Sequence, residues 1–448
     1  MPTSFALIRK VRNHLRLLWD DPEKFASNLL QFTNPSRFRE KLADVMVAAP
    51  LHVCVDPALA AAPALNVLQP ILSPTSMTGG PNTVVNVAFW VAKRGIKVRL
   101  VTTREAPGSH ASGTDPAWFS QHLALVTGAS VTGDPVPPPT LSVVSAADQA
   151  APLPIGPRDM FLATHWSTAQ QVKAQLPLMA VKRFFYLIQD FDPGLYAWSS
   201  NYALALETYE LDHIGVINQH QLYDYLLAQH AGRYADPGFA RGSLVFEPAI
   251  DRAVFHPPAE PRTGGKRRLL FYARPTNPRN MLGLGLNALR AAVADPAFQH
   301  AEWEFLAIGG RGGVPQMELG RGRRLIPESW VDYAGYSRLL READILLSPM
   351  LSPHTSYPVL EMAASGGIVV TNSFATKTRQ KLEALSANII AAPPTEAGLA
   401  NALIKAARRV TAGVDRYATL NLPADWQASL SGVAQRMAEI FRETVAVP

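Results

Sequence analysis

The spacing of apolar and polar residues changes along the chain, and from residue 65 onward short apolar runs alternate with helical segments. Short apolar runs between helices are typical of parallel strands that are buried on both faces. We therefore expect a first series of strands as far as about residue 250. It comprises strands at 65–72, 97–101, 160–163, 184–188, 214–217 and 244–246, with a helix at 81–93.

A second alternating series begins after Pro257, Pro258 and a polar stretch that ends at Arg268. Two such series predict an α/β chain with two Rossmann-like, doubly wound domains, at 51–250 and 251–425. The last helix, at 426–445 within a final segment 426–448, is expected to cross back onto the first domain. The second series comprises strands at 269–273, 305–308, 345–347, 368–370 and 389–390, and helices at 281–293, 357–365 and 377–385.

Residues 1–50 are expected to form a separate helical arm. Apolar residues between 5 and 19 recur at helical spacing, with arginines and a lysine on the other faces. One interpretation is a basic amphipathic helix on a membrane surface, which would make peripheral membrane contact. The other is an arm that packs against its own protein, and the shortness of the apolar stripe favours it.

The amino-acid composition limits the classes of binding partner and the cellular compartment that we expect. The net charge of +6 and a pI near 9.4 favour an anionic partner. Nucleic acid is disfavoured, because the basic residues are dispersed and no nucleic-acid-binding motif is found. The single cysteine, Cys54, excludes an internal disulfide framework and suits a reducing cytosol. No apolar run reaches the roughly 20 residues of a membrane-spanning helix, and no signal peptide is found. We therefore expect a cytoplasmic protein.

Three segments are candidates for chemistry, and the first contains Gly79 and Gly80. These glycines lie between the first strand and its helix, where backbone amides can approach an anion at a helix N-terminus. The third glycine of a dinucleotide fingerprint is missing. A tight strand-to-helix turn therefore explains this segment equally well.

The second candidate is Arg274, which directly follows a predicted strand, with Arg279 five residues later. Guanidinium groups at a strand's carboxyl end suit bidentate capture of phosphate oxygens. A pair of solvated arginines is the alternative, and the flanking prolines disfavour it.

The third candidate runs from Ser352 to Gly367. Thr355 and Ser356 are expected to cap a helix and leave free amides aimed at a phosphate. Glu361 follows the first turn and could accept a ribose hydroxyl. Taken alone, a buried helix with one acidic residue explains the segment better.

The sequence of this third segment resembles a known family. Residues 357–361, followed by 364–366, are similar to the segment Leu-Pro-Val-Leu-Glu-Ala-Met-Ala-Ser-Gly of glycosyltransferase family 4, which has the GT-B fold. Residues 247–251 with 255–257 resemble that family's linker motif. Residues 305–310 resemble its central strand and glycine turn, and by this resemblance Gly309 would contact the donor. More narrowly, 271–280, 186–194 with Trp198-Ser199, and 353–372 resemble the WsaF-type polyrhamnan-forming rhamnosyltransferases.

This resemblance implies a nucleotide-sugar donor, dTDP-L-rhamnose, bound mainly by the second domain. Arg274 would neutralise the diphosphate, with Arg279 as a second cation. Thr355, Ser356 and Tyr357 would lie over the phosphates, and Glu361 would bind the sugar of the nucleotide. The chain departs from the wider family at Pro353, where a glutamate usually contacts the transferred hexose.

Acceptor-side candidates lie at strand ends of the first domain. His165 is placed where related enzymes face the transferred sugar, although such a histidine is more often a packing residue. Asp190, with Gln189 and Asp192, could hold acceptor hydroxyls or act as the base. Two aromatic residues, Tyr196 and Trp198, could stack on a sugar ring.

These expectations combine into one predicted function: transfer of L-rhamnose from dTDP-L-rhamnose to an oligosaccharide or lipid-linked acceptor of a bacterial surface glycan. The resemblance implies retention of anomeric configuration. We expect no cofactor and no metal, because the sequence has neither an Asp-x-Asp loop nor a histidine cluster. Two alternatives stay open. One is a different GT-B enzyme, a UDP- or GDP-hexosyltransferase or an epimerase, and the other is a non-catalytic glycan-binding subunit.

Overall fold

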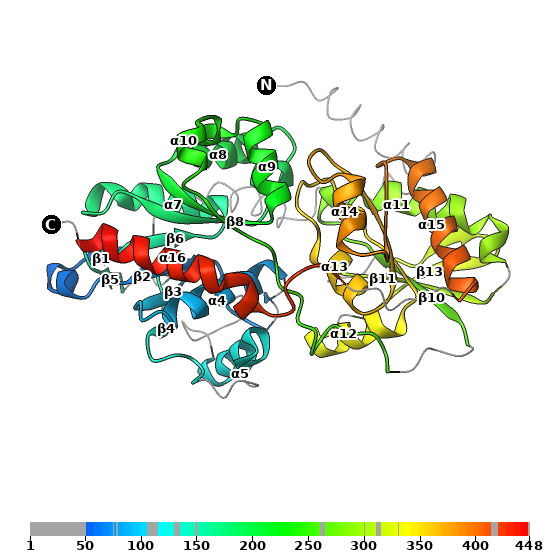
Figure 1. Cartoon of the computed structure of the whole chain (residues 1–448), viewed down its shortest axis with the longest axis horizontal. Coiled ribbons are helices and arrows are strands. Elements are labelled where there is room, and N and C mark those ends of the chain that lie inside the picture. Colours follow the sequence, from blue (N-terminus) through cyan, green and yellow to red (C-terminus); the bar gives the residue numbers. More distant parts are fainter. Residues whose placement is uncertain are drawn as a thin grey trace, which may run out of the picture. The chain divides into compact units, whose positions relative to one another are not determined.

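The computed structural model describes most of the chain after residue 50 (Figure 1). The predicted N-terminal arm, 1–50, lies outside the described residues. The described residues are 51–446 except 75, 78, 105–114, 130–134, 148–150, 260–264, 300, 311–314, 330 and 414–419. They contain two large sheets, and none of their helices is long and apolar enough to cross a bilayer.

The first sheet has seven strands, and all of its pairings are parallel. Five of its strands, β2, β3, β6, β7 and β8, are buried along their whole length, as expected for a sheet covered on both faces. In spatial order the strands are β4 (Leu141–Ser145), β3 (Val98–Thr102), β2 (Leu65–Gln69), β6 (Met160–Ala163), β7 (Phe184–Ile188), β8 (His213–Asn218) and β9 (Leu244–Phe246).

Helices cover both faces of this sheet. Leu65 and Val67 of β2 pack into one core with α4 and α5, whereas Leu68 packs into the other with α7 and α9. Successive strand residues therefore face opposite layers, as the pleat requires. The helices are α4 (Gly79–Ala92), α5 (Pro116–Thr127), α7 (Trp166–Gln175), α8 (Ser200–Glu207), α9 (His220–Ala228) and α10 (Pro237–Ala240).

The second sheet also has seven strands, of which β12 alone pairs antiparallel, with β13. Its order is β12 (Met317–Gly320), β13 (Arg323–Pro327), β11 (Trp303–Ile308), β10 (Arg267–Tyr272), β14 (Ile345–Leu347), β15 (Ile368–Asn372) and β16 (Ile389–Ala392). One face packs on α11 (Leu282–Val293) and α15 (Glu396–Thr411). The other packs on α12 (Tyr333–Glu342), α13 (Tyr357–Ala364) and α14 (Arg379–Leu385).

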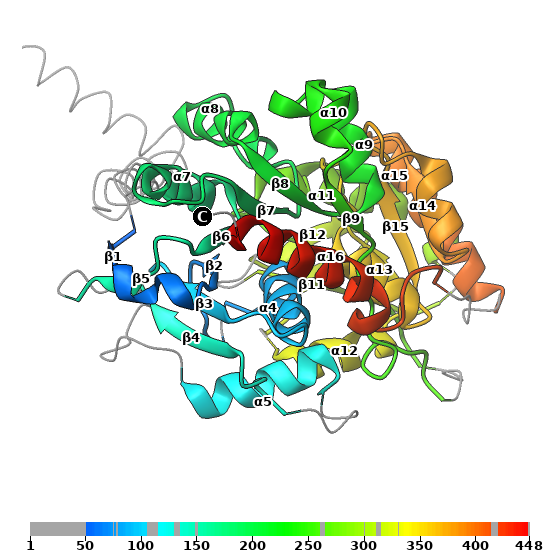
Figure 2. The same cartoon turned by 60° about the vertical axis from the view of Figure 1, so that its left-hand side comes forward.

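The final helix, α16 (Trp426–Ala446), packs on the first sheet's helices (Figure 2). Trp426, Leu430 and Phe441 belong to the core that also contains α4. The segments that lead into and out of the second sheet are hydrogen-bonded to each other, because Ile250 N–H donates to the Pro423 carbonyl at 3.1 Å. Two chain crossings therefore run side by side.

The predicted fold class, α/β with two Rossmann-like parallel sheets, is confirmed, although several element ends differ. The first strand ends at Gln69 and not at residue 72. The helix expected at 377–385 begins at Arg379 with Thr378 as its cap, while Lys377 forms an isolated bridge with Phe374. A small sheet, β1 (Val53–Val55) with β5 (Leu153–Ile155), was not predicted, because these strands are only three residues long.

Candidate active site

Each large sheet has a switch point, where neighbouring strands lead to connections on opposite sides. In the first sheet this is between β2 and β6, and in the second between β10 and β14. Ligands of open parallel sheets bind beyond the carboxyl ends of the strands at such points. Gly79 and His165 follow the first pair, and Arg274 and the loop 348–356 follow the second. Four of the predicted site segments therefore lie at switch points.

Arg274 lies directly after β10 and is partly exposed. Its guanidinium carbon is 5.9 Å from the ring centroid of Tyr272, close enough for a cation–π contact. Within the residues described, no carboxylate forms an ion pair with Arg274. A cation held at a strand end without a counter-ion remains available to an anionic ligand.

Gly309 supports this arrangement. Its φ of +89° is strained for other residues, and a Cβ atom there would lie 2.5 Å from Cε2 of Tyr272. Glycine is therefore needed so that β11 can turn closely past the ring beneath Arg274. The structure assigns Gly309 this packing role, and its predicted ligand contact remains a prediction.

Arg279 and Asp190, predicted to serve the donor and the acceptor, form an ion pair with each other. Ser352 Oγ also donates to Asp190 Oδ1, as does the Phe191 N–H at 2.8 Å. The Arg279 side chain is only 19% exposed, and burial lowers its pKa to about 10. One carboxylate from the first sheet thus bridges two segments of the second.

The start of α13 differs from the prediction. Ser356 occupies the cap position, but its side chain makes no capping hydrogen bond. The Thr355 N–H donates to Gln219 Oε1 at 2.8 Å, and its hydroxyl lies 3.4 Å from Gln221 Oε1. The prediction that both residues cap the helix is therefore wrong: only Ser356 occupies the cap position, and the Thr355 N–H is bonded to Gln219. The partners of Thr355 are Gln219 and Gln221, which follow β8. They lie far from Thr355 in the sequence, so local sequence patterns could not reveal these contacts.

Tyr357 reaches from α13 to the first sheet. Its hydroxyl lies 2.6 Å from Thr83 Oγ1 and accepts from Asn218 Nδ2 at 3.0 Å. Its ring covers Gly79, where a Cβ would lie 2.7 Å from Cδ2. Gly79 and Gly80 form the first turn of α4, and Gly80 faces the Gln189 amide. The predicted position of the two glycines between strand and helix is correct. The group that approaches Gly79 closely is the Tyr357 ring.

Glu361 is buried on the second turn of α13 and accepts a hydrogen bond from the Tyr336 hydroxyl at 3.0 Å. Burial raises the pKa of this carboxyl to about 7, and the bond from Tyr336 opposes that rise. One face of Glu361 lines a pocket, so a hydroxyl placed there could use its remaining oxygen.

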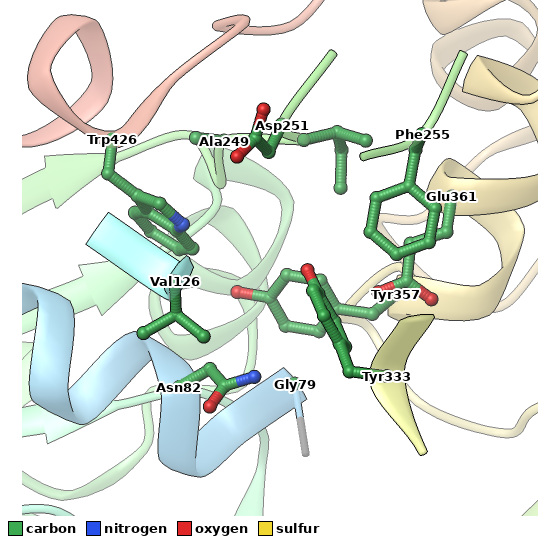
Figure 3. Close-up of a pocket in the computed structure, with 11 residues that line it drawn as sticks. Gly79, Asn82, Val126, Ala249, Asp251, Phe255, Tyr333, Tyr357, Glu361 and Trp426 are labelled. Carbon is green, nitrogen blue, oxygen red and sulfur yellow. The ribbon is translucent and has the colours of Figure 1, made fainter. Parts of the chain in front are cut away.

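The pocket beside Glu361 has a volume of about 30 Å³ (Figure 3). Figure 3 shows Tyr357 crossing it, with the hydroxyl directed away from Glu361 and Tyr333 standing alongside. Such a volume admits water but not a nucleotide sugar. Its lining residues are Gly79, Asn82, Val126, Ala249, Ile250, Asp251, Phe255, Tyr333, Tyr357, Glu361 and Trp426.

His165 caps α7. Its Nδ1 lies 2.8 Å from Ser167 Oγ and 3.3 Å from the Ser167 nitrogen. Burial lowers its pKa to about 4, and the charges of Arg104 and Arg279 act in the same direction. The imidazole is therefore neutral at pH 7. The capping role accounts for its position, and a contact with the transferred sugar remains a prediction.

Several polar side chains in this region escaped the sequence analysis. Their shared feature is a position at or after the end of a parallel strand, which was the available signal. Lys377, after β15, is 1% exposed. Several buried polar atoms of this region have no hydrogen-bond partner among the described residues. They include Gln189 Oε1, Asn218 Oδ1, Gln219 Nε2, Arg279 Nε and His354 Nε2.

Metal chemistry has no evident ligand set in the described part of the chain. There, no three side chains of His, Cys, Asp and Glu come together as a metal site would require. Positive charge near the switch point of the second sheet instead comes from arginine and lysine.

Comparison with known proteins gives these features a context. The WsaF N-terminal domain family matches residues 64–220, and the WsaF C-terminal domain family matches 267–404. The O-antigen biosynthesis protein RfbC of Myxococcus xanthus is 34% identical over 247 residues, which are 54% of this chain and 17% of that protein. The matched segment therefore spans less than a fifth of this relative.

Solved structures agree with the fold. Sucrose-phosphate synthase from Thermosynechococcus elongatus superposes with a TM-score of 0.56 at 16% identity, covering 86% of this chain and all of that one. HepE of Anabaena, solved in complex with UDP, gives a TM-score of 0.51 at 14% identity, covering 85% of this chain and all of that one. Both likenesses concern the fold. The two family matches together span more than half of the sequence in the expected order, and the chain belongs to the WsaF-type glycosyltransferases of GT-B fold.

Proposed function

We propose that this glycosyltransferase transfers L-rhamnose from dTDP-L-rhamnose to a growing bacterial surface glycan. The resemblance to polyrhamnan-forming enzymes at the donor segments supports the sugar and the base. The partial match to an O-antigen biosynthesis protein supports a surface glycan as product. The acceptor would be an oligosaccharide or lipid-linked glycan at the cytoplasmic face of the membrane.

One observation carries the proposal. Arg274 stands at the switch point of the second sheet, without a carboxylate partner among the described residues, one turn of chain from Arg279. Departure of a nucleoside diphosphate places negative charge on the leaving phosphate. Cations already fixed in place stabilise that charge without reorganising. This arrangement supports a reaction that needs neither metal nor cofactor.

Other residues take the remaining roles. Glu361 would accept a hydroxyl of the nucleotide sugar, because its carboxyl lines the pocket and retains an unused oxygen. Asp190 would orient or deprotonate the acceptor hydroxyl once released from Arg279. His165, neutral at pH 7, would face the transferred sugar without adding charge. The resemblance supports retention of anomeric configuration.

Entry of the donor requires a rearrangement. The pocket beside Glu361 is too small for a nucleotide, and Tyr357 crosses it while bonded to Thr83 and Asn218. We propose that donor binding breaks these two hydrogen bonds and moves the Tyr357 ring. Renewed closure around the substrates would exclude water and suppress hydrolysis of the donor.

A binding panel tests the donor. Calorimetric titration of the full chain with dTDP, UDP and GDP should show the tightest binding for dTDP. Incubation of dTDP-L-rhamnose with an acceptor glycan should then release dTDP in the presence of EDTA. Tighter binding of UDP would contradict the dTDP assignment and favour a hexosyltransferase. This alternative is worth testing because HepE, which has a similar fold, was solved in complex with UDP.

A second outcome separates catalysis from binding. Pro353 replaces the glutamate that usually contacts the hexose, which is the observation that favours a non-catalytic glycan-binding subunit. That subunit would bind glycan without releasing nucleotide from any activated sugar. Turnover of any nucleotide sugar excludes it.

A further inference from the structure

Lys377 is a buried cation with few partners. It follows β15, is 1% exposed, and donates from Nζ to the Met350 carbonyl at 3.0 Å. Among the described residues this carbonyl is its hydrogen-bond partner, and no carboxylate forms an ion pair with it. Two of its three N–H groups therefore lack a protein acceptor in that part of the chain.

Such burial is unfavourable unless something else compensates for it. Removing an ammonium group from water costs several kcal/mol when no counter-ion accompanies it. Burial accordingly lowers the pKa of Lys377 to about 7, and the charge of Arg279 lowers it further. A buried lysine without a carboxylate partner among the described residues, after the strand beside the switch point, suits the binding of an anion.

Lys377 and Arg279 are held on the same peptide group. The Met350 carbonyl accepts from Lys377, while the Leu351 N–H of that peptide donates to the Arg279 carbonyl at 2.9 Å. Asn372 fixes the segment by accepting from the Met350 N–H at 2.6 Å. The Lys377 ammonium group and the Arg279 backbone therefore meet on one peptide group, and the Arg279 charge lies close enough to lower the pKa of Lys377.

The charges around this peptide group do not balance. Asp190 is the carboxylate that pairs with Arg279, and Ser352 Oγ donates to it. His354 is buried nearby with Nε2 unpaired, and burial lowers its pKa to about 3, with Arg279 and Lys377 contributing. The described surroundings thus hold two cations, one carboxylate and a neutral histidine that donates or accepts.

We propose that Lys377 and Arg279 together bind the diphosphate of the donor, and that the Asp190 carboxylate paired with Arg279 stands where a donor phosphate would bind. This inference rests on the proposed function, because it assigns a third cation to the same donor site. Two cations match the charge of a diphosphate better than they match one carboxylate. Displacement by the donor frees Asp190 for the acceptor, which couples occupancy of the two sites.

The test compares Lys377→Met with Lys405→Met, a matched change at an exposed lysine of α15. Each variant is titrated with the nucleoside diphosphate that the wild-type protein binds best, and with its nucleoside monophosphate. Loss of one charge-assisted contact should weaken diphosphate binding about 10- to 100-fold. Binding of the monophosphate should weaken less, and Lys405→Met should match the wild type.

Thermal unfolding of Lys377→Met without added nucleotide shows whether Lys377 binds the ligand or only stabilises the fold through the Met350 carbonyl. If Lys377 merely held the Met350 carbonyl, its loss would lower the unfolding temperature. Removal of an uncompensated buried charge should instead leave the temperature unchanged or raise it. Unchanged diphosphate affinity in Lys377→Met overturns the inference, as does a lowered unfolding temperature. Absence of nucleoside diphosphate binding by the wild type would instead defeat the proposed function itself.

Asp190→Asn provides an independent arm that does not depend on the folding of the lysine variant. Asparagine keeps the shape of the side chain but removes the competing charge. It should therefore bind the diphosphate more tightly than the wild type, by a few-fold to about tenfold, while glycosyl transfer slows. Unchanged or weaker diphosphate affinity in this variant overturns the placeholder role of Asp190.

Discussion

The two large sheets share an architecture but present opposite chemistry at their switch points. Beyond the first sheet lie Asp190 and the neutral His165, while beyond the second lie Arg274, Arg279 and Lys377. The parallel strands and covering helices are similar in both, so the fold does not determine this difference. The few residues immediately after each strand do. This difference is consistent with the proposed binding of the anionic donor beyond the second sheet and of the acceptor beyond the first.

A second contrast concerns two buried carboxyl groups, one beside each sheet. Burial raises the pKa of both Asp192 and Glu361 to about 7. Asp192 accepts from the Trp166 N–H at 2.7 Å and so holds the start of α7. Glu361 instead borders a pocket. Similar pKa values therefore accompany a supporting role for Asp192 and the proposed binding role of Glu361.

The largest effect is expected for Arg274→Ala. Losing a fixed cation at the leaving diphosphate should lower kcat/KM about 100- to 1000-fold, with little change in the free energy of unfolding. Steady-state release of dTDP measures the first quantity and urea denaturation the second. Arg338→Ala, at an exposed arginine of α12, is the control and should keep wild-type activity. If Arg274→Ala and Arg338→Ala were equally active, Arg274 would not stabilise the leaving diphosphate, and the proposed role of the cations beyond the second sheet would be wrong.

The carboxyl pair predicts a pH dependence of stability. Between its ordinary pKa of 4.5 and about 7, Glu361 keeps its proton in the folded protein but loses it in the unfolded chain. The free energy of unfolding should therefore fall as pH rises through this window, by about 3 kcal/mol. Asp192 contributes with the same sign, from 3.8 to about 7.

Glu361→Gln should remove the part of this fall in unfolding free energy that Glu361 causes, and should therefore be more stable than the wild type at pH 8. Urea denaturation from pH 5 to 8 measures the difference. Asp192→Asn should flatten the remainder. Only Glu361→Gln should weaken donor binding, because Asp192 contacts α7 and not the pocket. If Asp192→Asn lost as much donor affinity as Glu361→Gln, the proposal that only Glu361 contacts the donor would be wrong.

The smallest effect is expected for Tyr357→Phe, which removes the hydroxyl that joins the two halves. Two hydrogen bonds, to Thr83 and Asn218, should cost about 1–2 kcal/mol of unfolding free energy. Tyr333→Phe, in the same pocket, is the matched control. Donor affinity should rise in Tyr357→Phe, because the ring can then move aside without breaking two hydrogen bonds. A loss of stability no larger than that of the control would show that this link contributes little.

Most of the fold could be predicted from sequence, because buried parallel strands are near-continuous apolar runs. Strands such as Phe184–Ile188 and Ile368–Asn372 were located within one or two residues. Errors concern the ends, as at Gln69, where the apolar pattern continues after the pairing stops. The short strands β1 and β5 carry too few residues to show a period.

The candidate site was predicted less well, for a physical reason. Strand-end positions of Arg274 and Glu361 follow from local pattern and from resemblance. The pairing of Asp190 with Arg279, and of Tyr357 with Thr83, depends on how distant segments meet. No local pattern encodes such contacts. Lys377 was predicted as the first residue of a helix, but the helix begins at Arg379 and Lys377 forms an isolated bridge with Phe374.

The return of α16 to the first sheet has a consequence for the order of events during synthesis. The core around α4 needs Trp426, Leu430 and Phe441, which follow the whole second sheet in the chain. The second sheet can assemble from contiguous sequence while the core around α4 still lacks its last helix. The earlier-made half is therefore completed last, and a nascent chain stalled before residue 426 would expose apolar surface on α4 to chaperones and proteases.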